Sequence, residues 1–283
     1  MSNVVQHWPG AWPVLAVWAI AAALHLAGPR RPRVRYRARE AAAFHGGVLL
    51  VLLALISPLG YWAGRYIWVR SIQDLLLAFA APALIVGGAP WKVRASGRPA
   101  ERSGRRRWPA WPVTVVVAFN VIWLGWHVTA AYDLAATNPA VRYLEYVSYV
   151  AAGTGFWLQL IGSRPALPPA RRLALLVGTA AADTVLGMVL VFGSAVVYPA
   201  YRGAGHHALS VLSDQQVAGA VLWMGVLPAV IIAALALING WLDAEESDQL
   251  SRDLDRVLGR TPVTPGPPRA VWHARSGYRR PTI

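Results

Sequence analysis

Two pairs of charged residues lie at helical spacing inside strongly apolar parts of the sequence. Arg70 and Asp74 stand four residues apart in IWVRSIQDLLLAFAAPALIVGGAP, and Arg142 and Glu145 stand three residues apart in NPAVRYLEY. Residues at these spacings share one face of a helix. An ionisable side chain in an apolar segment needs an opposite charge, a hydrogen-bond partner or water. We therefore predict a buried charge cluster, with pairing within each helix or across helices.

The elements that must carry these residues are long apolar helices. The 283-residue chain is 56% hydrophobic and 14% charged, whereas a soluble domain has about 25% charged residues. Seven segments approach the ~20 residues that a helix needs to cross about 30 Å of hydrocarbon. They are residues 11–27, 41–60, 67–90, 110–131, 140–162, 173–197 and 214–240. The sequence thus predicts an all-α polytopic membrane protein with seven transmembrane helices.

The distribution of basic residues predicts the orientation of these helices. Most of the 27 Lys and Arg residues follow the first, third, fifth or seventh span. These segments lie on one side of the membrane, and the positive-inside rule makes that side cytoplasmic. The N-terminus is then outside and the C-terminus inside, N-out/C-in. We attribute the formal net charge of +14 to topology and contacts with anionic lipid headgroups of the bilayer, not to nucleic acid.

With this orientation, polar residues from several spans reach the same depth near the outer face. The third, fifth and seventh spans begin there, and the fourth ends there. We call the following residues the polar cluster: Arg70, Gln73, Asp74, Arg142, Glu145, Asp214 and Gln215. The alternative interpretation is that its arginines reach headgroup water by snorkelling. We take the polar cluster as the main candidate site.

A further acid, Asp183, lies near the middle of the predicted sixth span, in GTAAADTVLG. A carboxylate at that depth needs a partner, a proton or water. The small residues before it allow a neighbouring helix to approach closely. We expect a hydrogen bond between helices, and a proton path is the alternative.

Two helix starts have recognisable capping residues. Asn138 followed by Pro139 is a favourable N-cap and first-turn combination for the fifth span. Ser213 with Gln216 three residues later matches a capping box for the seventh span.

Several motifs resemble the CtaG family of bacterial membrane proteins. They are SPL at 57–59, QDLLLAFAAPALIVGGAP at 73–90, WHVTAAYD at 126–133 and SDQQVAGAVLWM at 213–224. Their order and spacing extend the resemblance over about residues 45–243. The resemblance implies a seven-helix protein of the bacterial cytoplasmic membrane that supports cytochrome c oxidase assembly. It also implies copper delivery, with oxidase subunits or a copper carrier as partners.

The chain departs from the family pattern at four histidines. The pattern His-x-x-Gln-His on the third span reads RSIQD from Arg70 to Asp74, and His-x-x-Glu-His on the fifth reads RYLEY from Arg142 to Tyr146. The resemblance therefore implies a charge network in the place of paired imidazoles. Because guanidinium groups repel a bound cation, these differences change the electrostatics as well as the ligand count.

Without these four histidines, the sequence has few candidate copper ligands. Copper prefers imidazole, thiolate or thioether groups, the chain has no Cys, and Met188 and Met224 stand well inside predicted spans. The histidines expected at the outer face are His127, His206 and His207. They are the candidate metal ligands, and the alternative is that they are solvated or hydrogen-bonded without a metal.

The composition changes after the seventh span. LDAEESDQLSRDLDRVLGR has acids early, Arg late, and Leu250 and Leu254 on one face, which predicts an amphipathic helix. A Pro-rich stretch and a basic end follow, which we expect to be disordered. We divide the chain into a membrane domain, residues 1–243, and a cytoplasmic tail, residues 244–283.

The leading functional hypothesis is a membrane accessory protein for oxidase assembly. One alternative is an ion or small-solute transporter that uses the polar cluster, and another is a non-catalytic subunit or scaffold of a respiratory complex. We predict that the protein is not an enzyme, because the sequence has no Cys nucleophile, phosphate loop or recognisable triad.

Overall fold

The computed structural model of the chain describes residues 38–88, 111–161, 167–203 and 209–259, and all regular elements in these ranges are helical. The elements are α3 (Ala38–Ile56), α4 (Pro58–Ala63), α5 (Ile67–Leu75), the π-helical turn η1 (Leu76–Ala80), α6 (Ala81–Gly87), α8 (Trp111–Trp126), α9 (Thr129–Thr137), α10 (Pro139–Ile161), α11 (Pro169–Phe192), the 3₁₀ helix η2 (Pro199–Gly203) and α12 (Val211–Val257). The prediction of an all-α fold is confirmed. Contacts divide the chain into one unit of residues 1–238 and a second of residues 239–283.

Several helices in the described ranges can cross a membrane. Four are long and apolar enough, and α8 with α9 makes a fifth if this bent pair is one span. The four are α3, α5 to α6, α11 and α12. The helix α10 has 23 residues, enough for a span, but its Tyr, Ser, Arg and Glu residues make it less apolar. The predicted first span, 11–27, lies outside the described residues. The chain is thus a multi-pass membrane protein.

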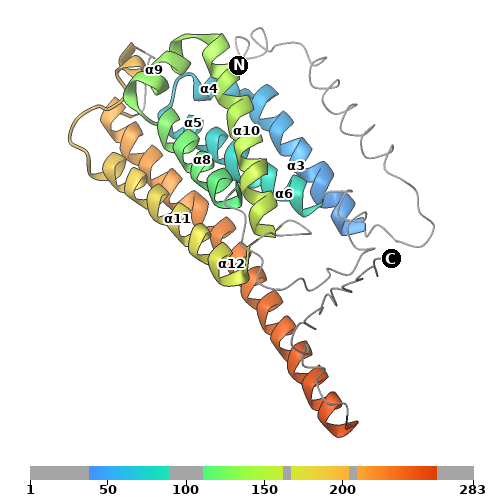
Figure 1. Cartoon of the computed structure of the whole chain (residues 1–283). Helices are drawn as coiled ribbons and strands as arrows, with labels where there is room; N and C mark the ends of the chain where they lie inside the picture. Colours follow the sequence, from blue (N-terminus) through green and yellow to red (C-terminus); the bar gives the residue numbers. More distant parts are fainter. Residues whose placement is uncertain (1–37, 89–110, 162–166, 204–208, 260–283) are drawn as a thin grey trace, which may run out of the picture. The chain divides into compact units, whose positions relative to one another are not determined.

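The predicted fourth span, residues 110–131, is not continuous. The helix α8 ends at Trp126, α9 begins at Thr129, and the two are bent by 69°. Between them Val128 has an extended backbone, with φ −67° and ψ 134°. The N–H groups of His127 and Val128 donate to carbonyls three residues earlier, which tightens the end of the helix. The bend turns α9 away from the axis of α8 (Figure 1).

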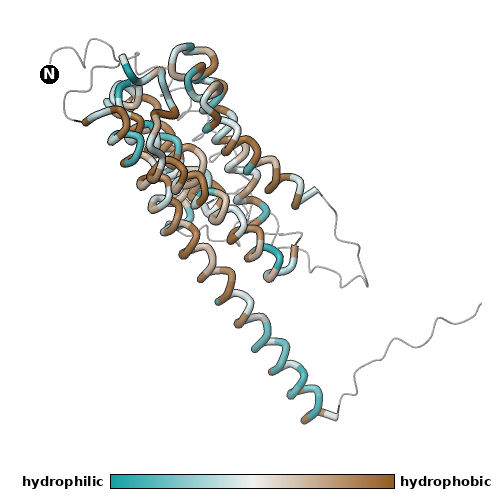
Figure 2. The backbone as a smooth tube through the Cα atoms, turned by 90° about the vertical axis from the view of Figure 1, so that its left-hand side faces the viewer, coloured by the Kyte–Doolittle hydropathy of each residue, from teal (hydrophilic) through white to brown (hydrophobic). Residues whose placement is uncertain are grey.

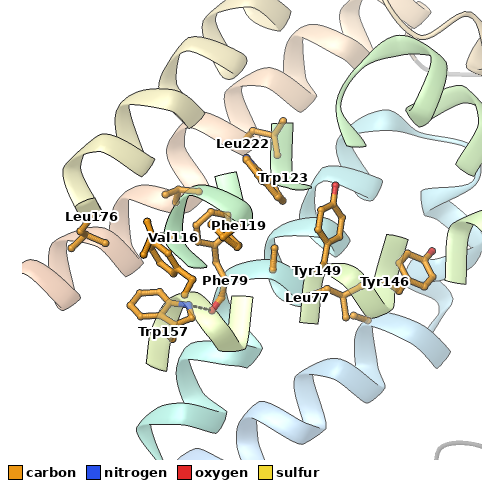
Figure 3. Packing of buried hydrophobic residues seen from close by; sticks show 14 of the residues in the cluster. Leu77, Phe79, Val116, Phe119, Trp123, Tyr146, Tyr149, Trp157, Leu176 and Leu222 are labelled. Atoms are coloured by element: carbon orange, nitrogen blue, oxygen red, sulfur yellow. Dashed lines mark hydrogen bonds between the residues drawn. The ribbon is translucent and has the colours of Figure 1, made fainter. Parts of the chain in front are cut away.

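The core of the first unit is aromatic (Figure 3). Phe79 of η1 packs edge-to-face against Phe119 and Trp123 of α8, with both ring centroids 5.1 Å away. Phe119 stacks on Phe156 of α10 at 4.6 Å. Such pairs contribute about 0.5–1.5 kcal/mol each beyond the area they bury. The aromatic contacts therefore hold α8 and α10 against η1.

The π-helical turn at Leu76–Ala80 precedes Pro82. Proline has no N–H to donate, and its ring clashes with the carbonyl four residues earlier, here that of Ala78. A wider turn relieves this clash. The carbonyl of Phe79 accepts a hydrogen bond of 2.9 Å from Nε1 of Trp157 (Figure 3). This hydrogen bond links η1 to α10.

The helices α11 and α12 approach each other closely at two glycines. A Cβ atom on Gly187 would lie 2.7 Å from the Cβ of Trp223 and 2.9 Å from the carbonyl oxygen of Gly219. Small residues at such a point let helices pack backbone to backbone in a membrane. The contact therefore requires glycine on both helices.

The described part of the second unit, residues 239–259, consists of the polar end of α12 and the two residues that follow it. Figure 2 shows the hydropathy of α12 changing from hydrophobic to hydrophilic toward this end. Leu250, Leu254 and Val257 are exposed, and Arg256 forms an ion pair of 2.6 Å with Asp253. A helix lies where the amphipathic helix was predicted. The basic end that we expect to be disordered starts at residue 260, outside the described residues.

Candidate functional site

The centre of the polar cluster is a buried ion pair between α5 and α10. Nη2 of Arg70 lies 2.8 Å and 2.7 Å from the two carboxylate oxygens of Glu145, and both side chains are buried. Of the pairings left open by the sequence, the structure thus contains the one across helices between Arg70 and Glu145 at 2.7 Å, and a longer one within α5 between Arg70 and Asp74 at 4.0 Å. The alternative interpretation, that Arg70 reaches headgroup water by snorkelling, is wrong, because its side chain is only 2% exposed.

Aromatic residues enclose the rest of the Arg70 guanidinium. Its Cζ lies 3.9 Å from the centroid of the Tyr132 ring. Its Nη1 donates to the carbonyl of Tyr132 and to the hydroxyl of Tyr201, both at 3.3 Å. The hydroxyl of Tyr201 donates to the carbonyl of Ala63 at 3.0 Å. Arg70 therefore joins α5, α9, α10 and η2.

Asp74 is a second carboxylate beside the same guanidinium. Its Oδ2 lies 4.0 Å from Nε of Arg70, and its side chain is fully buried. Within the described residues neither oxygen of Asp74 has a hydrogen-bond partner. One guanidinium thus faces two carboxylates, and Glu145 holds its hydrogen bonds. Asp74 is the polar group with the most unused bonding capacity in the polar cluster.

Gln73 links three helices. Its Nε2 donates to the carbonyl of Ala54 in α3 at 2.6 Å. Its Oε1 accepts a bond of 3.0 Å from the hydroxyl of Tyr146 in α10. Both polar ends of this buried amide are therefore satisfied, and its role is to position α5 between α3 and α10.

Arg142 lies apart from the central ion pair. Its Nε and Nη2 donate to the carbonyls of Ala135 and Ala136, at 3.0 Å and 2.6 Å. Among the described residues Arg142 has no carboxylate within ion-pair distance. It thus caps the C-terminal turn of α9 with a positive charge, which the helix dipole favours. Pairing of Arg142 with Glu145 or Asp74, the other possibility from the sequence, is absent.

The two polar residues of α12 bind backbone. The carboxylate of Asp214 accepts hydrogen bonds from the N–H groups of Ile67 and Trp68, at 2.8 Å and 3.1 Å. It therefore caps the N-terminus of α5, where negative charge is favoured. Gln215 accepts from the Val197 N–H at 2.7 Å and donates to the Ala195 carbonyl at 3.1 Å.

The predicted capping box at the start of α12 is wrong. Asp214 and Gln215 are fully buried, and Asp214 lies in the first turn of α12. The helix begins at Val211, and Ser210 Oγ accepts the Ser213 N–H at 3.0 Å, so Ser213 is not the cap of a capping box. The other predicted cap is confirmed, since Asn138 Oδ1 accepts the Ala140 N–H at 2.9 Å.

His127 is buried at the end of α8. Its Nδ1 lies 2.8 Å from the carbonyl of Trp123, and its Nε2 has no partner within the described residues. His206 and His207, the other predicted metal ligands, lie outside the described residues. In the described part of the chain, no three His, Cys, Asp or Glu side chains gather in a way that could hold a metal ion.

Asp183 belongs to a separate contact between α11 and α8. It accepts a hydrogen bond of 3.1 Å from Nε1 of Trp123. One turn away along the same two helices, Asn120 of α8 donates to Thr179 of α11 at 3.0 Å. The two bonds together favour the structural interpretation of Asp183 over a proton path.

Sequence reasoning missed the tyrosines around Arg70. Tyr132 stacks on Tyr198 with centroids 3.9 Å apart, and Tyr198 donates to the carbonyl of His127 at 3.1 Å. Burial raises the pKa of Tyr198 and of Tyr201 in the link between α11 and α12, so both hydroxyls stay neutral donors. Only the position of Tyr132 in the WHVTAAYD motif pointed to any of them.

The fold and the buried cluster define a multi-pass helical membrane protein whose polar residues are paired internally. A family model described as cytochrome c oxidase caa3 assembly factor (Caa3_CtaG) matches residues 16–244. The chain therefore belongs to this family of oxidase assembly factors, as its motifs indicated. No curated protein and no solved structure matches the chain.

Proposed function

We propose that this protein is a non-enzymatic accessory factor that supports cytochrome c oxidase assembly in the bacterial cytoplasmic membrane. The observation that carries the proposal is the family match over residues 16–244. The structure supports it because the polar cluster fixes the positions of α5, α9, α10 and η2. A rigid surface of this kind suits docking of another protein better than turnover of a substrate.

The proposed topology is seven spans with the N-terminus outside and the C-terminus inside. Residues 1–243 would form the membrane domain and residues 244–283 the cytoplasmic tail. The support is the one-sided distribution of Lys and Arg. Because the chain has no Cys, single cysteines introduced at Arg202 and Leu254 can be labelled in intact cells. Labelling of the first position alone supports the topology, and the reverse pattern contradicts it.

The proposed docking surface is the exposed side of α9 and η2. The buried face of these elements contacts the Arg70 guanidinium through Tyr132 and Tyr201. Their opposite face exposes Leu134 and Arg202. The Ala200 N–H also donates to Asp133 at 3.3 Å, which ties η2 to α9. We assign an oxidase subunit or a copper carrier to this surface.

In this proposal copper is bound by a partner protein and not by this chain. Imidazole and thiolate are the ligands that copper prefers, and His127 is the only described imidazole at the polar cluster. The Arg70 guanidinium in the same cluster repels a cation. The described donors therefore do not fit a copper site, and we place the metal on the carrier. Copper that co-purifies with the wild-type chain but not with a variant lacking His127, His206 and His207 would contradict this placement.

The test of the assembly role is gene deletion followed by haem and copper spectra of the terminal oxidase. We expect the oxidase signal to fall in the deletion strain and to return with the wild-type gene. Leu134→Glu should fail to restore it, whereas Leu254→Glu in the tail, an equally drastic change at another exposed leucine, should restore it. An unchanged oxidase spectrum in the deletion strain would contradict the proposal.

A further inference from the structure

A polar pocket and an apolar groove meet between α3 and α10. The pocket has a volume of about 290 Å³, and the polar side chains among its lining residues are Ser57, Tyr61, Gln73, Thr137, Arg142, Tyr143 and Tyr146. The groove has a volume of about 470 Å³ and is lined by Val51, Leu55, Leu77, Tyr143, Tyr146, Val147, Val150, Ala151 and Thr154. Leu55, Tyr143 and Tyr146 line both. Both volumes lie at or near the size of small-molecule sites, roughly 300–1,000 Å³.

The pocket contains a positive charge that the described protein does not neutralise. Arg142 uses Nε and Nη2 to bind the end of α9, and Nη1 donates to none of the described residues. No described carboxylate lies within ion-pair distance. An anion in the pocket would supply both the missing charge and an acceptor for Nη1, and a phosphate oxygen suits a guanidinium in charge and geometry.

The groove opens toward hydrocarbon. Val147 is 66% exposed and Tyr143 is 64% exposed, on a helix that lies among membrane-spanning helices. Tyrosine is enriched where the hydrocarbon meets the headgroups, and Tyr143 lines both the polar pocket and the apolar groove. The site is therefore amphiphilic, with one polar end and one apolar end.

We propose that this site binds one anionic phospholipid, with its phosphate beside Arg142 and one acyl chain along the groove. Basic pockets between membrane helices are known to hold anionic headgroups. The lining of the groove favours a chain over a partner helix. Membrane helices pack through small residues, whereas seven of the nine residues that line the groove are valines, leucines and tyrosines, and only Ala151 and Thr154 are small. A flexible acyl chain can follow such an uneven surface.

The site shares Gln73 and Arg142 with the polar cluster. Gln73 lines the pocket, and its Oε1 accepts a hydrogen bond from the Tyr146 hydroxyl. A bound headgroup therefore lies beside the side chain that positions α5 between α3 and α10. The bound lipid would therefore strengthen the contact of α3, α5 and α10. This inference does not depend on the proposed assembly function.

The test is native mass spectrometry of delipidated full-length protein. The probes are phosphatidylglycerol, phosphatidylcholine with the same acyl chains, and inorganic phosphate. We expect the wild type to retain phosphatidylglycerol about fivefold better than phosphatidylcholine, the amount that one basic residue contributes near an anionic surface. Inorganic phosphate alone should not displace the lipid. Displacement by phosphate would indicate a simple anion site and would overturn the proposal.

Two sets of variants localise the binding, and the first set concerns the charge in the pocket. Arg142→Gln should abolish the preference, and Arg142→Lys, which keeps the charge if Gln weakens folding, should retain part of it. Arg202→Gln, which removes an exposed arginine outside the pocket, should leave the preference unchanged. An equal preference in the wild type and Arg142→Gln would overturn the proposal.

The second set consists of a variant that blocks the groove and a control outside it. Ala151→Phe fills the apolar end and should reduce retention of both lipids, whereas Val185→Phe, at an exposed position on α11, should not. Equal retention by these two variants would place the lipid elsewhere and overturn the proposal. Crosslinking of position 151 to a partner helix, with no retained lipid, would also overturn it.

Discussion

The two carboxylates beside Arg70 differ in their bonds, and amide substitutions should reveal the difference. Glu145 makes two short hydrogen bonds to Nη2, at 2.8 Å and 2.7 Å. Asp74 lies 4.0 Å from Nε and has no hydrogen-bond partner within the described residues. We therefore expect Glu145 to be the main counter-ion and Asp74 to act as a reserve when Glu145 is removed.

The expected changes in the free energy of unfolding follow from the distances between the two carboxylates and the Arg70 guanidinium. Asp74→Asn removes no hydrogen bond, so the free energy of unfolding should change by about 1 kcal/mol or less. Glu145→Gln should lower it by only about 1–2 kcal/mol, because a charge 4 Å away at an effective dielectric constant near 20 still attracts by about 4 kcal/mol. The double variant leaves Arg70 buried without a counter-ion and should lose about 3–5 kcal/mol.

The assay is a double-mutant cycle on the free energy of unfolding in mild detergent. At the middle of these ranges the loss in the double variant exceeds the sum of the single losses by about 2 kcal/mol, as expected for groups that share a partner. The matched control combines Glu145→Gln with Asp183→Asn, a buried acid that bonds Trp123 instead, and should be additive. Additive losses in the Asp74 and Glu145 cycle would refute the reasoning.

Three further changes probe the contacts around this centre, each by unfolding measurements on the purified protein. Asp214→Ala leaves two N–H groups of α5 without their cap and should cost about 1–2 kcal/mol, and a loss near zero would contradict the capping role. Gly187→Ala places a methyl group against α12 and should cost about 1–3 kcal/mol, while Gly178→Ala, where a Cβ meets open space, should not destabilise. Because burial raises the pKa of Tyr198 above its ordinary value of 10.0, the folded state binds more protons than the unfolded state at alkaline pH. Stability should therefore fall as the pH rises above about 10, and Tyr198→Phe should fall less, whereas identical alkaline curves would contradict a buried hydroxyl.

The helical class and the convergence of the polar cluster could be predicted because membranes restrict structure strongly. A span needs a long apolar run, and charged residues inside one need partners. These two rules identified α5 and α10 and the pairing possibilities of Arg70. They left the choice between Glu145 and Asp74 open, because that choice depends on the rotation of α10 against α5.

Features set by contacts distant in sequence could not be predicted. Asp214 was expected at a helix start because its neighbours match a capping pattern, yet it caps α5 at Ile67, 147 residues away. The break after Trp126 occurs in an apolar run whose Pro112 and Asn120 lie well before it, so neither residue predicts its position. Tyr198 and Tyr201 lie in a link that has no periodic pattern, and only the tertiary fold brings Tyr201 to Arg70.

The π-helical turn before Pro82 fixes the length of the chain in this helix. A π turn holds one residue more than an α turn, and each residue of an α-helix advances the side chains by about 100°. Deleting one residue from Leu76–Ala80 would therefore rotate everything on one side of the turn by roughly a quarter of a circle. Arg70 and the packing of α6 could then no longer both face inward, so we expect insertions and deletions at this point to be far more harmful than substitutions.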